Sequence, residues 1–87
     1  MSDPARVNFH PHARARLGER GATEEEAVLT VRAGERFSAK FDRSGFRRNF
    51  PYNAVWMGRM FATKQIEAFA VFEHGAWLVL TVIVKYF

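Results

Sequence analysis

The sequence predicts an α+β fold, in which a helical hairpin packs on one face of an antiparallel sheet. The predicted element order is β-α-α-β-β-β, with room for one further strand. Helix signals are confined to the first 34 residues, and the remainder alternates apolar and polar side chains between turn signals. With 87 residues and no cysteine, the chain has the length of a single domain, residues 1–87, that folds without disulfides.

The first part of the chain contains a short strand and two helices. Residues 5–9 alternate polar and apolar side chains, which is typical of a strand. Pro11 suits the first turn of a helix that runs to Arg20, because its missing N–H costs nothing there. Thr23-Glu24-Glu25-Glu26 is a capping box that begins a second helix, and Gly34 supplies its stop at the C′ position. Because few residues separate the helices, we expect them to pack as a hairpin.

The second part contains the strands of the sheet. Residues 35–41 predict one strand, and residues 46–50 continue extended until Pro51 interrupts them. Residues 56–62 are compatible with a strand or with a loop followed by a strand. Residues 66–72 are rich in Phe and Val and predict a further strand.

The last strand, residues 76–87, follows a hairpin turn and has the near-continuous apolar run of a central strand. Strict alternation places one set of residues on the face expected under the helices: Ala76, Leu78, Leu80, Val82, Val84 and Tyr86. It places the other set on a face expected to be open: Trp77, Val79, Thr81, Ile83, Lys85 and Phe87. Thr81 then places a hydroxyl in the middle of the sheet. It is either an ordinary β-branched strand residue or a residue of the functional site.

The positive charge of the chain is concentrated. All thirteen basic residues except Lys40, Lys64 and Lys85 are arginines, whose planar guanidinium suits phosphate and stacks on bases. One short segment holds five basic residues against a single acid, which equals the whole net charge of +4: Arg36, Lys40, Arg43, Arg47 and Arg48. Aromatic residues interleave with them, which favours RNA as the partner. The alternative is a solvated basic face, or an acidic protein partner.

Three polar residues of the first predicted helix share one face. His12, Arg16 and Arg20 follow the spacing i, i+4, i+8. A neutral imidazole beside arginines that hold a phosphate could act as general base on a ribose 2′-OH, which is the chemistry of RNA cleavage without a metal. The alternative is that His12 bonds a backbone group while the arginines pair with nearby glutamates. No third metal ligand accompanies His10 and His12, so we expect no metal and no cofactor.

The sequence shows no targeting segment. Residues 1–20 contain no apolar run of the kind that a secretory signal needs. The most apolar stretch, residues 76–84, is nine residues long and too short to span a bilayer. We therefore expect a cytoplasmic protein with no membrane partner.

The order of motif residues resembles a known family. The string His12-Ala13-x-x-Arg16-x-x-Glu19-Arg20-Gly21-Ala22-Thr23-x-x-Glu26 is similar to the opening of a family of small bacterial proteins, the domain of unknown function 4258. Gly34-Glu35, Phe46-Arg47-Arg48, Ala62-Thr63-Lys64-Gln65 and Val79-x-Thr81-Val82 fit the same pattern. The predicted element order looks like that of RelE/ParE toxins. The resemblance implies action on RNA or the ribosome and neutralisation by an antitoxin protein.

Three hypotheses follow for the function. The first is a RelE/ParE-like toxin of a toxin–antitoxin system, which cleaves RNA without a metal or blocks translation. In it, His12, Arg16, Arg20, Thr81 and Lys85 act at the scissile phosphate, and a basic group grips the RNA: Arg36, Lys40, Arg43, Arg47, Arg48 and Lys64. The second is a non-catalytic nucleic-acid-binding module. The third is a protein-interaction domain that forms homodimers through aromatics such as Trp56, Trp77 and Phe87.

Overall fold

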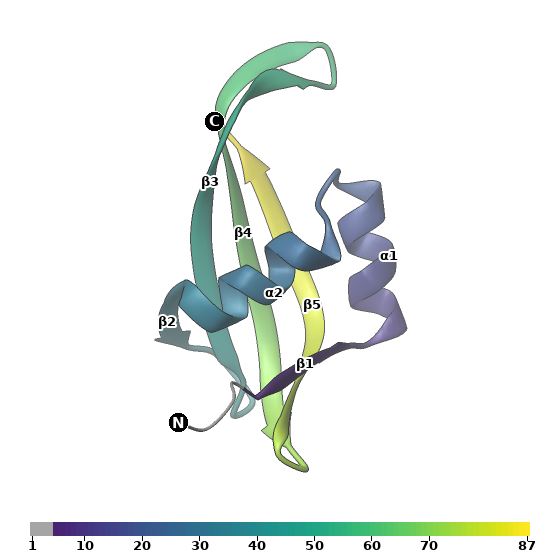
Figure 1. The fold of residues 1–87 in the computed structure, drawn as a ribbon, viewed down its shortest axis with the longest axis vertical. Helices are drawn as coiled ribbons and strands as arrows, with labels where there is room; N and C mark the ends of the chain where they lie inside the picture. Colours follow the sequence, from purple (N-terminus) through teal and green to yellow (C-terminus); the bar gives the residue numbers. More distant parts are fainter. Residues whose placement is uncertain (1–4) are drawn as a thin grey trace.

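The computed structural model describes residues 5–87 and shows two helices packed against a five-stranded mixed sheet (Figure 1). Along the chain the elements are β1 (Arg6–Phe9), α1 (Pro11–Glu19), α2 (Glu24–Ala33), β2 (Glu35–Ser38), β3 (Ser44–Trp56), β4 (Arg59–Glu73) and β5 (Ala76–Tyr86). The strands lie in the order β1-β5-β4-β3-β2. The predicted α+β class is therefore confirmed. No helix within residues 5–87 is long and apolar enough to cross a membrane.

The sheet is mixed rather than wholly antiparallel, so that part of the prediction is wrong. Strands β2 to β5 pair antiparallel with their neighbours in sequence. Strand β1 pairs parallel with β5, from Arg6 opposite Ala76 to Phe9 opposite Val79. The first strand thus lies beside the last, although both helices and the three strands β2 to β4 separate them in the sequence.

The helix starts are as predicted. Pro11 occupies the first turn of α1. The capping box of α2 is present, with Thr23 Oγ1 accepting from the Glu26 N–H at 3.1 Å and Glu26 accepting from the Thr23 N–H at 2.9 Å.

Helix α2 ends at Gly34 for a different reason from the one expected. Gly34 has φ −78°, and a Cβ there would lie 2.4 Å from the Thr30 carbonyl oxygen and 2.7 Å from that of Arg47. A close approach of α2 to β3 requires this glycine.

The two helices do not pack as a hairpin. Helix α1 lies along β5 and also contacts β1, whereas α2 crosses β3 and β4 (Figure 1). Each helix buries its own apolar side chains in the sheet: Ala13 and Leu17 from α1, Ala27 and Val31 from α2. The helices diverge because each one follows the sheet surface beneath it rather than its neighbour in sequence.

A bulge in β5 changes which residues face the helices. Phe69 pairs with Thr81 but Ala70 pairs with Val79, so Leu80 is an extra residue with no partner. The predicted assignment of β5 side chains to the helix-covered face is therefore correct only for residues after Leu80, where Val82 is buried in the core. Before it the parity is reversed, because Val79 is fully buried and Trp77 packs against the core. Beyond the bulge Thr81, Ile83 and Lys85 face away from the helices, as predicted.

Strand β3 continues through Pro51 to Trp56, so Pro51 does not end the strand as predicted, although the pairing with β4 has a bulge between Pro51 and Ala54. Thr63, which lies opposite Pro51, directs its own N–H and C=O to Phe87, the residue after β5. The nitrogen of Pro51 therefore points to the outer edge of β3, where β2 no longer pairs and no hydrogen bond is lost. Residues 56–62 contain the turn between β3 and β4 and the start of β4.

Candidate nucleic-acid interface

Two hollows meet at Thr81 on β5. One, of about 340 Å³, runs between α1 and the end of β5, and its lining includes Arg16, Arg20 and Thr81. The other, of about 270 Å³, lies against the loop between β2 and β3, and its lining includes Lys40, Phe41, Arg43 and Thr81. Both hollows border Thr81, and we refer to them together as the Thr81 groove.

The groove exists because β1 is short. It pairs with β5 only as far as Val79, where the His10 N–H donates to the Val79 carbonyl at 2.9 Å. Beyond Val79, no strand within residues 5–87 pairs with that edge of β5. Helix α1 runs along the open edge and brings Arg16 and Arg20 to it.

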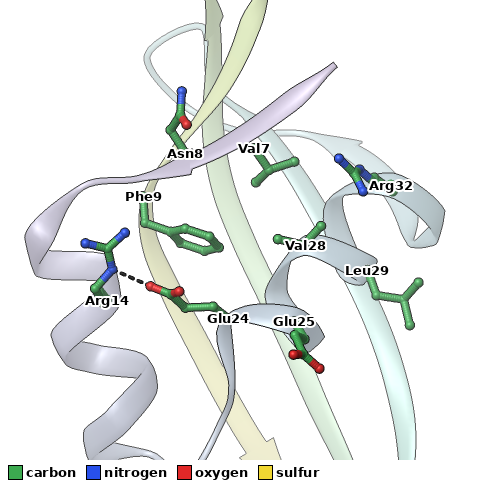
Figure 2. Close-up of a pocket in the computed structure, with 9 residues that line it drawn as sticks. All are labelled: Val7, Asn8, Phe9, Arg14, Glu24, Glu25, Val28, Leu29 and Arg32. Atoms are coloured by element: carbon green, nitrogen blue, oxygen red, sulfur yellow. Dashed lines mark hydrogen bonds and ion pairs between the residues drawn. The ribbon is translucent and has the colours of Figure 1, made fainter. Parts of the chain in front are cut away.

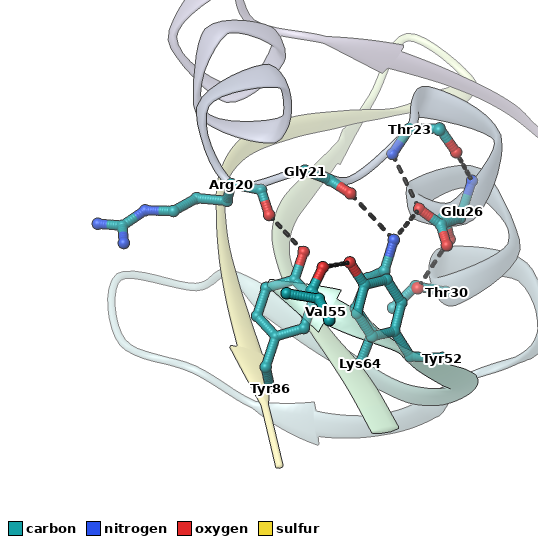
Figure 3. Close-up of polar contacts among 9 residues, drawn as sticks. All are labelled: Arg20, Gly21, Thr23, Glu26, Thr30, Tyr52, Val55, Lys64 and Tyr86. Atoms are coloured by element: carbon teal, nitrogen blue, oxygen red, sulfur yellow. Dashed lines mark hydrogen bonds and ion pairs between the residues drawn. The ribbon is translucent and has the colours of Figure 1, made fainter. Parts of the chain in front are cut away.

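The end of α1 is fixed to the sheet by two hydrogen bonds (Figure 3). The Tyr86 hydroxyl donates to the Arg20 carbonyl at 2.6 Å, and the Lys64 ammonium donates to the Gly21 carbonyl at 3.0 Å. Burial raises the pKa of Tyr86, with smaller contributions from Tyr52 and Glu26, so the phenol remains a donor at neutral pH. These contacts hold the backbone from which the Arg20 side chain extends.

The groove is strongly basic. It is lined by four cations: Arg16, Arg20, Lys40 and Arg43. Within the described residues, no carboxylate lies within 4.0 Å of any of them. Unneutralised cations along a groove attract polyanions, because binding releases the counterions that a phosphate backbone condenses.

The groove also presents an aromatic ring to solvent. Phe41 is 83% exposed, and the Arg43 guanidinium lies 5.8 Å from the centre of its ring. Phe69 lines the same hollow and packs edge-on against Phe37 at 5.9 Å. An exposed ring beside a guanidinium is a platform on which a base can stack.

His12 and Lys85 do not line the Thr81 groove. His12 stands one helical turn before Arg16 on α1, and its backbone N–H donates to His10 Nδ1 at 3.1 Å. Lys85 faces the same way as Thr81, but it lies four residues further along β5 and pairs with Glu67 at 3.4 Å. The structure thus brings together Arg16, Arg20 and Thr81 of the five proposed catalytic residues.

The basic segment of residues 36–48 does not form one patch, because strand alternation divides it between the two faces of the sheet. Arg47 lies on the same face as Thr81, where it pairs with Glu67 at 3.0 Å. Arg36 lies 5.2 Å from the Trp77 ring, and Arg48 reaches the Ala33 carbonyl at 3.5 Å. Only Lys40 and Arg43 of the segment line the groove.

Lys64 is buried and makes internal contacts. Its side chain is 8% exposed, and its ammonium bonds both the Gly21 carbonyl and Glu26 Oε1, the latter at 3.1 Å (Figure 3). The ammonium also lies 5.2 Å from the Tyr52 ring. This geometry gives Lys64 a structural role rather than the predicted phosphate contact.

Sequence reasoning missed Glu67. Its side chain is 8% exposed and accepts from Arg47 while pairing with Lys85. A single acidic residue between Ile66 and Ala68, in an otherwise apolar strand, is the sequence feature that indicates a paired carboxylate there. No group of three His, Cys, Asp or Glu side chains that could hold a metal occurs among residues 5–87.

Comparison with known proteins does not add to this description. No protein-family model, curated protein or solved structure matches the chain. The function is therefore argued from the geometry and charge of the Thr81 groove.

Proposed function

We propose that this chain is a nucleic-acid-binding module that holds single-stranded RNA in the Thr81 groove. The supporting observation is the convergence at Thr81 of four cations without carboxylate partners and one exposed aromatic ring. Phosphates and bases are the two features of a nucleic acid strand that such a surface can contact at once.

The two hollows of the groove contact different parts of the RNA strand. Arg16 and Arg20 bind phosphates, because a guanidinium donates two parallel hydrogen bonds to phosphate oxygens. Phe41 receives a base, which requires an unstacked strand rather than a duplex. Thr81 borders both hollows, and its hydroxyl can donate to or accept from a ribose 2′-OH, the group that distinguishes RNA from DNA.

The salt dependence of RNA binding tests this proposal. Binding of a labelled single-stranded RNA is measured over a range of salt for the wild type and the double variant Arg16→Gln/Arg20→Gln. The slope of log K against log salt should fall by about 1.4, since each phosphate contact on a single strand contributes about 0.7. Arg32→Gln removes a charge on α2, outside the groove, and is the matched control. An unchanged slope in the double variant, or an equal loss per charge removed in the control, contradicts the proposal.

The second candidate is the RelE/ParE-like toxin, which cleaves the bound RNA or blocks translation and is neutralised by an antitoxin. One observation favours it: His12 shares a helix face with Arg16, one turn from the groove. To act as base, its imidazole has to approach the 2′-OH to about 3 Å once RNA is bound. Cleavage by the wild type that His12→Ala abolishes, with binding retained, supports the toxin. Binding without cleavage supports the simple module.

A further inference from the structure

A second cavity lies on the helix side of the molecule, away from the Thr81 groove. It has a volume of about 730 Å³, is open to solvent and is bordered by β1, α1 and α2 (Figure 2). It forms because the two helices diverge over the sheet and leave space between them. Small-molecule sites typically measure about 300–1,000 Å³, so this cavity holds one such ligand.

The centre of the cavity is apolar and is not filled by the protein. Val7 and Phe9 from β1 face Val28 from α2 across it, and Leu29 lies at the rim with its side chain directed away from Phe9 (Figure 2). Leu29 is 42% exposed, and the other three are only partly buried. Covering these side chains with an apolar ligand is favourable, because it removes apolar surface from water.

The charged groups around this apolar centre favour an anion. The Arg14 guanidinium donates through Nε to Glu24, and its two terminal nitrogens have no hydrogen-bond partner within residues 5–87. Arg32 lies near Val7 and has no carboxylate partner in the described chain. Glu24 is engaged by Arg14, and the Glu25 carboxylate points away from Phe9 and Val28 (Figure 2).

We infer that this cavity binds a small amphipathic carboxylate. The apolar body lies between Phe9 and Val28, and the carboxylate accepts from Arg32 and from the free nitrogens of Arg14. Glu24 positions Arg14 by fixing its Nε, so that the planar group is oriented before the ligand arrives. This site shares no lining residue with the Thr81 groove and does not depend on RNA binding.

Decanoate is a suitable probe, because it has one carboxylate and an unbranched apolar chain. Its binding to the intact chain is measured by titration calorimetry, and the site is located by amide chemical shifts. We expect saturable 1:1 binding, with the shift changes concentrated in β1 and α2. Decanol, which has the same chain and no charge, should bind at least tenfold more weakly.

Two variants test the two halves of the site. Arg32→Gln should weaken decanoate severalfold and leave decanol unchanged, whereas Leu29→Glu should weaken both. Arg20→Gln, which removes an arginine from the Thr81 groove, should change neither and serves as the control. The inference is overturned by absence of saturation, by equal affinity for decanoate and decanol, or by shift changes centred on Thr81.

Discussion

Lys64 offers the sharpest test of the structure, because the sequence suggests an RNA contact and the geometry shows a structural ion pair. Its ammonium bonds the Gly21 carbonyl at 3.0 Å and Glu26 Oε1 at 3.1 Å. The replacement Lys64→Met keeps most of the packed side-chain stem and removes only the charged donor. It leaves the Gly21 carbonyl without a donor and leaves the Glu26 carboxylate with the Thr23 N–H alone.

The expected loss in the free energy of unfolding is about 2–3 kcal/mol. Breaking a buried ion pair by removing one partner costs about 3–5 kcal/mol. The cost here falls below that range because the Glu26 side chain is 23% exposed and keeps one hydrogen bond. For a domain of this size, about 1 kcal/mol lowers Tm by about 4–8 °C, so Tm should fall by about 10–20 °C.

Urea denaturation followed by circular dichroism measures this loss, and a double-mutant cycle assigns it. Glu26→Gln removes the carboxylate but retains an oxygen for the Thr23 N–H, so the capping box is preserved. The variant that carries both changes should lose about 1–2 kcal/mol less than the sum of the two single losses, because their interaction is counted only once.

RNA affinity distinguishes the two roles of Lys64. Measured at a temperature where the variant is folded, Lys64→Met should bind RNA as the wild type does, because the ammonium does not line the Thr81 groove. A loss of stability below about 0.5 kcal/mol, the scale of an ordinary surface substitution, together with a weakened RNA affinity, would refute the structural role.

Three further predictions concern the packing of the helices on the sheet, and urea denaturation measures each. Gly34→Ala should cost about 2 kcal/mol or more because its Cβ meets two carbonyl oxygens, whereas Gly18→Ala, with no atom within 4 Å, should stabilise α1 by about 1 kcal/mol. Leu17→Ala should cost about 3 kcal/mol, since Leu17 is 1% exposed in the core, and a loss under about 1 kcal/mol would contradict its burial. Tyr86→Phe should cost about 1 kcal/mol below pH 10 through the lost bond to the Arg20 carbonyl. Because the raised pKa of Tyr86 favours the protonated phenol in the folded state, wild-type stability should decline as pH rises above about 10, and Tyr86→Phe should lack that part of the decline.

The sequence predicted the features that depend on neighbouring residues. The capping box at Thr23 and the turn before β5 are local, because a few side chains and backbone angles decide them. The crossing of the helices and the parallel pairing of β1 with β5 depend on segments about 70 residues apart, as Arg6 and Ala76 show. No local pattern reports such a contact.

In the candidate site too, the features set by neighbouring residues could be predicted and those set by long-range contacts could not. The helical spacing of Arg16 and Arg20 placed them correctly on one side of α1, and both line the groove. The burial of Lys64 could not be predicted, because it requires that β4 pass beneath the start of α2 and meet Glu26. Lys85 likewise forms its ion pair with Glu67 only because β4 and β5 pair in one particular register.

The bulge at Leu80 connects the core of the protein to its groove. Without the extra residue, strict alternation would place Thr81 on the same face as Val79, which is fully buried in the core. The bulge shifts the parity, so that Val79 and Val82 both pack in the core while Thr81 between them faces the other way. Thr81 therefore borders both hollows instead of joining the core, because one residue of β5 lies outside the ladder, and bulges of this kind are frequent beside functional sites. This irregularity is a structural reason, independent of charge, to place the function of the chain at Thr81.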